Sequence, residues 1–101
     1  MFLGRVVGQV WATRRDETLD GQRLLVIEAI DTANDPAAAK VTPVVAADPI
    51  GADVGERVIV AFGKAARVAC GGDGDRAFEA AVVGIVDDLD APNAPDSWRQ
   101  A

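Results

Sequence analysis

The feature that most constrains the fold is the first apolar run of the chain, which extends from Phe2 to Thr13 and is interrupted by Gly8. β-Branched and aromatic residues alternate in part with glycine and polar residues along this run, which is the pattern of a strand with one buried face. A glycine inside such a run is typical of a bulge or a sharp bend. We therefore expect a long first strand that curves.

Four further runs have strand composition and are separated by turn signals. Asp16–Gly21 has turn chemistry and lies between the first two runs, so these runs predict a hairpin. The later strands are expected from Leu24 to about Ile30, from Val41 to Ala47, from Arg57 to Phe62 and from Ala80 to Val86. Pro43 predicts a late start or an edge position for the third strand. The nearly continuous apolar run of the fifth predicts the most buried strand.

The connections between these runs are short or polar. Residues 31–40 predict an exposed loop with room for one helical turn, and Cys70–Asp75 has the composition of a flexible loop. Gly63–Val68 is alanine-rich and predicts a single helical turn before the last strand. We expect one domain over residues 1–87, followed by an acidic, proline-containing tail over residues 88–101.

Five short strands with a bent first strand predict an all-β fold, a small five-stranded barrel of the oligonucleotide/oligosaccharide-binding (OB) type. A bent strand lets a small sheet close on itself and hide its edges. A chain of 101 residues has a small core and a narrow margin of stability. Burial of further surface against copies of the same chain would widen this margin, so the length is consistent with an oligomer.

The charge and the missing residue types exclude several function classes. The formal net charge is −6, from 16 acidic and 10 basic residues, which opposes binding to nucleic acid. The chain has no histidine, the usual proton shuttle and metal ligand at neutral pH. Its single cysteine, Cys70, has no partner for a disulfide or a thiolate metal site. We expect no metal and no cofactor.

The sequence also indicates a cytoplasmic protein. No segment approaches the ~20 apolar residues of a membrane helix, and the amino terminus lacks the order of regions of a signal peptide. A lone cysteine fits a reducing compartment. We therefore expect no membrane partner.

Three groups of residues have a chemical interpretation beside a structural one. Gly51–Glu56 is either an anion cradle of backbone amides or a tight turn that needs permissive glycine dihedrals. Asp87–Asp90 is either a ligand set for a hard cation or a solvated acidic strand end. Glu28 and Glu79 would form an acid–base pair only if they met in a cleft, and Cys70 would be a nucleophile only beside a base.

Several glycine-punctuated blocks occur in order along the chain. They begin at Leu3 (LGRVVGQV), Leu19 (LDG), Ile50 (IGADVGE), Gly63 (GKAAR) and Ala80 (AAVVGIVD). Together they resemble the bacterial microcompartment vertex proteins of the EutN/CcmL family, over residues 1–87. The chain departs from the family pattern at Asp53, Lys64, Ala77 and Glu79. Asp53 stands where the family has glycine, so we expect a left-handed backbone there, which Asp tolerates better than most residues.

The resemblance implies a structural function. Members of this family are five-stranded barrels that form ring pentamers at the corners of polyhedral shells, next to hexameric shell proteins. A head-to-tail contact that closes after five copies is the required symmetry. The resemblance places the following residues near the five-fold axis or the subunit interface: Gly51, Ala52, Asp53, Gly55, Glu56, Gly63, Lys64, Ala66 and Arg67.

The remaining expectations concern the tail and the alternatives. Arg67 either pairs with an acidic residue of the adjacent subunit or is simply exposed, and Trp98 either docks on a neighbour or belongs to a frayed end. An OB-like nucleic-acid or ligand-binding module is the alternative function. It requires a basic groove with exposed aromatic residues, and neither is visible in the sequence. A small enzyme that uses Glu28, Glu79 or Cys70 is a third possibility.

Overall fold

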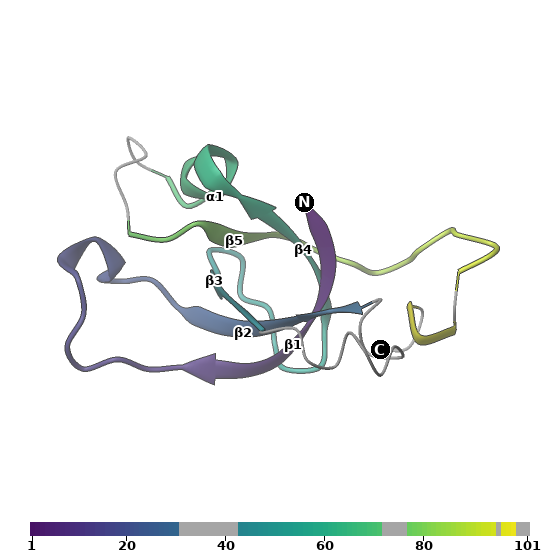
Figure 1. Cartoon of the computed structure of the whole chain (residues 1–101), viewed down its shortest axis with the longest axis horizontal. Helices are drawn as coiled ribbons and strands as arrows, with labels where there is room; N and C mark the ends of the chain where they lie inside the picture. Colours follow the sequence, from purple (N-terminus) through teal and green to yellow (C-terminus); the bar gives the residue numbers. More distant parts are fainter. Residues whose placement is uncertain (31–42, 72–76, 95, 99–101) are drawn as a thin grey trace.

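The computed structural model describes residues 1–30, 43–71, 77–94 and 96–98. These residues form a closed barrel in the strand order β1-β2-β3-β5-β4, with one short α-helix over its outer surface (Figure 1). The elements are β1 (Phe2–Val10), β2 (Leu24–Ala29), β3 (Val44–Ala47), β4 (Arg57–Phe62), α1 (Gly63–Ala69) and β5 (Ala80–Ile85), with 3-10 turns at Glu17–Leu19 and Asp96–Trp98. The predicted all-β class, the five-stranded barrel and the helix before the last strand are confirmed.

β1 and β2 form the predicted hairpin, and β1 also pairs with β4. The register of the hairpin shifts between Val6 and Gly8, so the irregularity lies where the sequence predicts it. A Cβ atom at Gly4 would overlap Cγ2 of Ile27 and lie 3.2 Å from the Glu28 carbonyl oxygen. Gly4 therefore allows β1 and β2 to approach closely at this position, before the register shift.

The strand boundaries differ from the predicted ones where pairing ends. β1 ends at Val10 and not at Thr13, because its last partner is Leu24, the first residue of β2. β3 begins at Val44, directly after Pro43, and the two residues predicted before Pro43 lie outside the described part of the chain. The loop predicted at 31–40 and most of the loop predicted at 70–75 also lie outside it.

The prediction that the fifth strand is the most buried is confirmed, because β5 has no exposed residue whereas β4 ends in the exposed Phe62. β4 and β5 each bury three of their six residues, and in β5 these are the first three. β3 pairs with β5 only at Ala47 and Ala81, so the second half of β5 has no strand on that side. Its residues from Val83 onward are therefore half-buried.

Two apolar clusters hold the structure together. The barrel interior contains Val6, Leu25, Ile27, Ala46, Ala52, Val58, Val60, Ala80 and Val82. A second cluster lies under α1, where Ala47, Ala66 and Ala81 pack with Phe78. Small side chains at these three positions let the helix lie close to the strands.

The hairpin end and the tail are tied down by polar contacts. Asp16 caps the Glu17–Leu19 turn, and its exposed carboxylate accepts hydrogen bonds from the hydroxyl and the amide of Thr18. These hydrogen bonds lower the pKa of the Asp16 carboxyl below its usual value. At the other end of the chain, Arg57 Nη1 donates to the Trp98 carbonyl oxygen at 2.8 Å.

Trp98 packs against its own barrel. It lines a cavity of about 220 Å³ together with Phe2, Leu3 and Ile30. Its indole Nε1 is buried without a hydrogen-bond partner. A domain boundary after residue 87 stays a prediction. Within the described residues no helix has the length and apolar character needed to cross a membrane.

Candidate functional site

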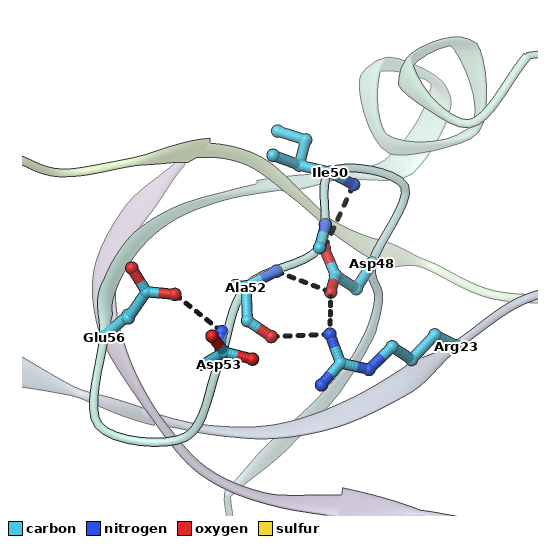
Figure 2. Close-up of polar contacts among 7 residues, drawn as sticks. Arg23, Asp48, Ile50, Ala52, Asp53 and Glu56 are labelled. Atoms are coloured by element: carbon cyan, nitrogen blue, oxygen red, sulfur yellow. Dashed lines mark hydrogen bonds and ion pairs between the residues drawn. The ribbon is translucent and has the colours of Figure 1, made fainter.

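The loop from Asp48 to Glu56 is built around a buried carboxylate. Oδ1 of Asp48 accepts hydrogen bonds from the amides of Ile50 at 3.1 Å and Gly51 at 2.9 Å, and Oδ2 accepts one from Ala52 at 2.9 Å (Figure 2). Gly51 has a φ of 100°, a conformation that favours glycine. The amides that would cradle an external anion thus already hold the chain's own carboxylate.

Arg23 compensates the buried charge. Its Nη1 lies 2.9 Å from Oδ2 of Asp48 and donates to the Ala52 carbonyl oxygen at 2.6 Å (Figure 2). The Asp48 side chain is fully buried, whereas Arg23 keeps part of its surface in solvent. A buried ion of this kind is stable only when its lone pairs are also hydrogen-bonded, as they are here. Arg23 therefore connects the loop to the start of β2.

A tight turn at 53–56 follows and leads into β4. Oε1 of Glu56 accepts from the Asp53 amide at 2.7 Å, and the Glu56 amide donates back to the Asp53 carbonyl oxygen at 3.1 Å. Two backbone hydrogen bonds with Val6, at 2.8 and 3.0 Å, attach Gly55 and Glu56 to β1. The turn is thus held in place from both sides.

The expectation of a left-handed backbone at Asp53 is wrong. No described residue other than glycine has a positive φ, and Gly55 has a φ of 96°. The hydrogen bonds of Gly55 and Glu56 to β1 place the sharp change of direction at Gly55. Asp53 only starts the turn, so an acidic residue is accommodated there without backbone strain.

The second predicted block forms α1. Gly63 begins the helix with a φ of 62°, and its amide donates to the Glu79 carbonyl oxygen at 2.8 Å. Ala66 is fully buried against the barrel, whereas Lys64 is exposed. Nη1 of Arg67 lies 2.9 Å from Oε1 of Glu79, so within the chain Arg67 has an acidic partner of its own.

The structure places the predicted site residues in two separate groups. Residues 51–56 precede β4 and residues 63–67 follow it, so the two groups lie at opposite ends of this six-residue strand. At about 3.3 Å per residue the strand separates them by about 20 Å. They do not form a single pocket.

The other sequence candidates are not brought together. Glu28 lies opposite Arg5 in the β1–β2 pairing, whereas Glu79 is bound to Arg67 beside α1. Asp88 accepts a hydrogen bond from the neighbouring Leu89 amide. Cys70 follows α1 and packs against the cluster beneath it. Among the described residues, no three side chains of metal-ligating type are grouped.

Sequence reasoning missed the Arg23–Asp48 pair and the exposed apolar residues. Asp48 is followed by Pro49-Ile50-Gly51, a pattern typical of an aspartate that bonds the amides after it, which is the one local signal for its role. Its ion pair joins residues 25 positions apart, which no local pattern shows. The large apolar side chains that remain exposed include Val7, Trp11, Val45, Ile50, Val54, Phe62 and Val68.

Comparison with known proteins gives one consistent family. Residues 1–87 match the family model described as "Ethanolamine utilisation protein EutN/carboxysome". The bacterial microcompartment shell vertex protein GrpN of Rhodospirillum rubrum is 42% identical over 93 residues, which cover 92% of this chain and 100% of GrpN. The carboxysome shell vertex protein CcmL of Synechocystis sp. is 41% identical over 87 residues, or 86% of this chain and 83% of CcmL.

Solved structures agree with these relatives. The GrpN pentameric microcompartment shell protein from Rhodospirillum rubrum superimposes with a TM-score of 0.73 at 37% identity, and the match covers 90% of this chain and 99% of that one. A structure described as ethanolamine utilization protein EutN superimposes with a TM-score of 0.76 at 34% identity, covering 92% and 93% of the two chains.

Proposed function

Because this chain belongs to the EutN/CcmL family, we propose that it is a structural shell protein whose homopentamers occupy the vertices of a bacterial microcompartment. The observation that carries the proposal is the end-to-end match to GrpN, a vertex protein with a pentameric solved structure. The family model matches residues 1–87, which include all five described strands of the barrel.

The surface of the single chain supports an assembly. Val54, Phe62 and Val68 are large apolar side chains that are 57%, 47% and 59% exposed. Burial of apolar surface against another copy would stabilise both copies, and a small barrel has much to gain from it. A contact that repeats in the same sense around a closed ring buries such side chains in every subunit.

The vertex role follows from symmetry. A flat layer of hexamers cannot close, because five-fold units are needed to introduce curvature. We infer that the pentamer inserts among hexameric shell proteins in the cytoplasm, without nucleic acid or membrane as partners. We further infer that the chain has no catalytic role of its own, since the curated relatives are shell proteins.

The mass of the particle in solution tests the pentamer. Native mass spectrometry and sedimentation at micromolar concentration should give a species of five times the 10.5 kDa of one chain. A clean monomer under these conditions contradicts the proposal. Salt-dependent binding to a labelled single-stranded oligonucleotide would instead support the alternative OB-like module.

Co-production with hexameric shell proteins tests the vertex role. With this chain present, electron microscopy should show closed polyhedral shells, and without it open sheets, tubes or shells with missing corners. A variant that stays monomeric is the matched control, because it should behave like the sample without the chain. Closed shells with complete corners in both samples would contradict the vertex role.

A further inference from the structure

We propose that the barrel has a binding site for a small, uncharged, apolar molecule of the size of a substituted benzene, at the place where the C-terminal turn docks. This inference does not depend on the pentamer and goes beyond the structural function proposed above. It rests on a cavity, on the side chains around it and on the contacts that hold one of its walls.

The walls of the cavity are apolar. The cavity has a volume of about 220 Å³, is partly open to solvent, and is lined by two aromatic and two aliphatic side chains, Phe2, Leu3, Ile30 and Trp98. None of these side chains carries a charge. The one polar side-chain atom among them, Nε1 of Trp98, is buried and out of reach of solvent. Water that enters the cavity therefore finds no side-chain hydrogen-bond partner, which favours an apolar occupant.

The volume limits the size of the occupant. An apolar cavity of about 150 Å³ is large enough to bind benzene, whereas pockets for drug-sized ligands have volumes of about 300–1,000 Å³. The cavity described here lies between these values. It therefore has room for one six-membered ring with a small substituent.

The barrel holds two of the walls in place. Phe2 is the first residue of β1, and its ring stacks on Phe62 with the ring centroids 5.3 Å apart. Ile30 directly follows β2 and is 4% exposed. A site whose walls are fixed in advance loses little conformational entropy when a ligand binds.

A single guanidinium group holds the wall that contains Trp98. Nη1 of Arg57, at the start of β4, donates to the Trp98 carbonyl oxygen at 2.8 Å, and Nη2 donates to the Asp87 carbonyl oxygen at 3.4 Å. Arg57 thus binds the chain both where the tail leaves the barrel and where it returns, beside the end of β2 (Figure 1). The tail is therefore part of the site.

The docked turn lacks part of the compensation that docking requires. Trp98 is only half-buried, and its indole N–H is buried without an acceptor, which opposes docking. An aromatic molecule in the cavity would pack against Trp98 and Phe2 and add contacts that the barrel alone does not supply. Ligand binding and docking of the tail should therefore stabilise each other.

A titration with fluorobenzene tests the site. Fluorine NMR of the probe with the full-length chain should show saturable binding, with a Kd on the order of 1 mM or below. Of the two tryptophan indole N–H signals, that of Trp98 should shift and that of Trp11, which is 83% exposed, should not. Fluorobenzoate should bind at least tenfold more weakly, because the walls offer its charge no partner. Absence of saturable binding, equal binding of fluorobenzoate, or a shift of Trp11 instead of Trp98 overturns the inference.

Two variants locate the site. Leu3→Trp fills the cavity and should weaken fluorobenzene binding at least tenfold, whereas Val45→Trp, at a position that is 49% exposed on β3 and does not line the cavity, should leave it unchanged. Arg57→Gln leaves the lining intact but loosens the tail, so it should weaken binding severalfold and speed amide exchange at residues 96–98. Fluorobenzene should slow this exchange in the wild-type chain.

The variants also separate this inference from the proposed function. If Leu3→Trp and Arg57→Gln both bind fluorobenzene as the wild-type chain does, the site is wrong whether or not the chain forms a pentamer. If the wild-type chain is monomeric and binds the probe as described, the proposed function fails and the site stands.

Discussion

At the scale of single residues, the most informative one is Asp48, an internal anion that shapes the loop before β4. Its carboxylate accepts hydrogen bonds from three backbone amides and one from Arg23. Without the carboxylate, these four donors would need water as their hydrogen-bond partner. The loop then presents Val54 and Asp53 in one shape. The charge of Asp48 thus determines the geometry of residues that it does not touch.

Removal of this carboxylate should destabilise the chain. Asp48→Ala leaves the amides and the partly exposed Arg23 without their partner, which corresponds to a loss of about 3 kcal/mol in unfolding free energy. Denaturant unfolding at a fixed protomer concentration measures the loss. Formate should restore part of it in the variant, because a small carboxylate fits the vacated position, and chloride at equal ionic strength is the control. A variant as stable as the wild-type chain would contradict this role.

Gly4 and Gly8 are expected to tolerate substitution differently. Gly4→Ala places a Cβ atom against Cγ2 of Ile27, and overpacking of this kind costs about 1–3 kcal/mol. A Cβ atom at Gly8 meets only Val26, at 3.9 Å, so Gly8→Ala should leave stability nearly unchanged. Thermal unfolding of the two variants under identical conditions tests this difference. Equal effects would show that close approach is not what requires glycine at position 4.

At the scale of elements, the local pattern predicted the strands, whereas contacts distant in sequence determined their ends. Pro43 indicated the late start of β3, because proline at a strand start is a local property. The end of β1 was not predictable although the start of β2 was, since it depends on the register of the hairpin, which pairs Val10 with Leu24. The wrong prediction of a left-handed backbone at Asp53 has a similar cause. The hydrogen bonds of Gly55 and Glu56 to Val6 determine that Gly55, and not Asp53, has the positive φ.

The carboxy-terminal turn that contains Trp98 supports a prediction of its own. Trp98→Ala should destabilise the chain by about 1–2 kcal/mol, because it exposes the apolar cavity beside Phe2, Leu3 and Ile30. Trp98→Phe should cost less, or even stabilise the chain, since it keeps most of the ring and removes an indole N–H that has no acceptor. Denaturant unfolding of both variants is the measurement. A larger loss for Phe than for Ala would contradict the packing described here.

At the scale of the whole molecule, the sequence predicted the barrel and the family, but not which surfaces lie on opposite sides of it. The blocks at 51–56 and 63–67 were both recognised as candidates, yet only the placement of β4 between them shows that they form two surfaces. Arg67 was open to pairing with a neighbour, and the structure gives it Glu79 of the same chain. Asp53, Glu56 and Lys64 are then the charged residues of the two groups that form no ion pair within the described part of the chain.

Thermal stability should depend on protein concentration if the ring forms. Association stabilises the folded chain by mass action, so the unfolding midpoint of the wild-type chain should rise as concentration is increased a hundredfold. Scanning calorimetry over this range makes the comparison. A midpoint that is independent of concentration would contradict assembly.

The position of β5 in the barrel has a consequence for synthesis. β5 is the last strand in the chain, yet it lies between β3 and β4 and supplies Ala80 and Val82 to the interior. A nascent chain that has not yet reached residue 80 therefore carries two open strand edges and an uncovered core. Such edges are the usual starting points of misassociation. Barrel closure must await synthesis of β5, so both edges and the interior stay open until this strand has been made.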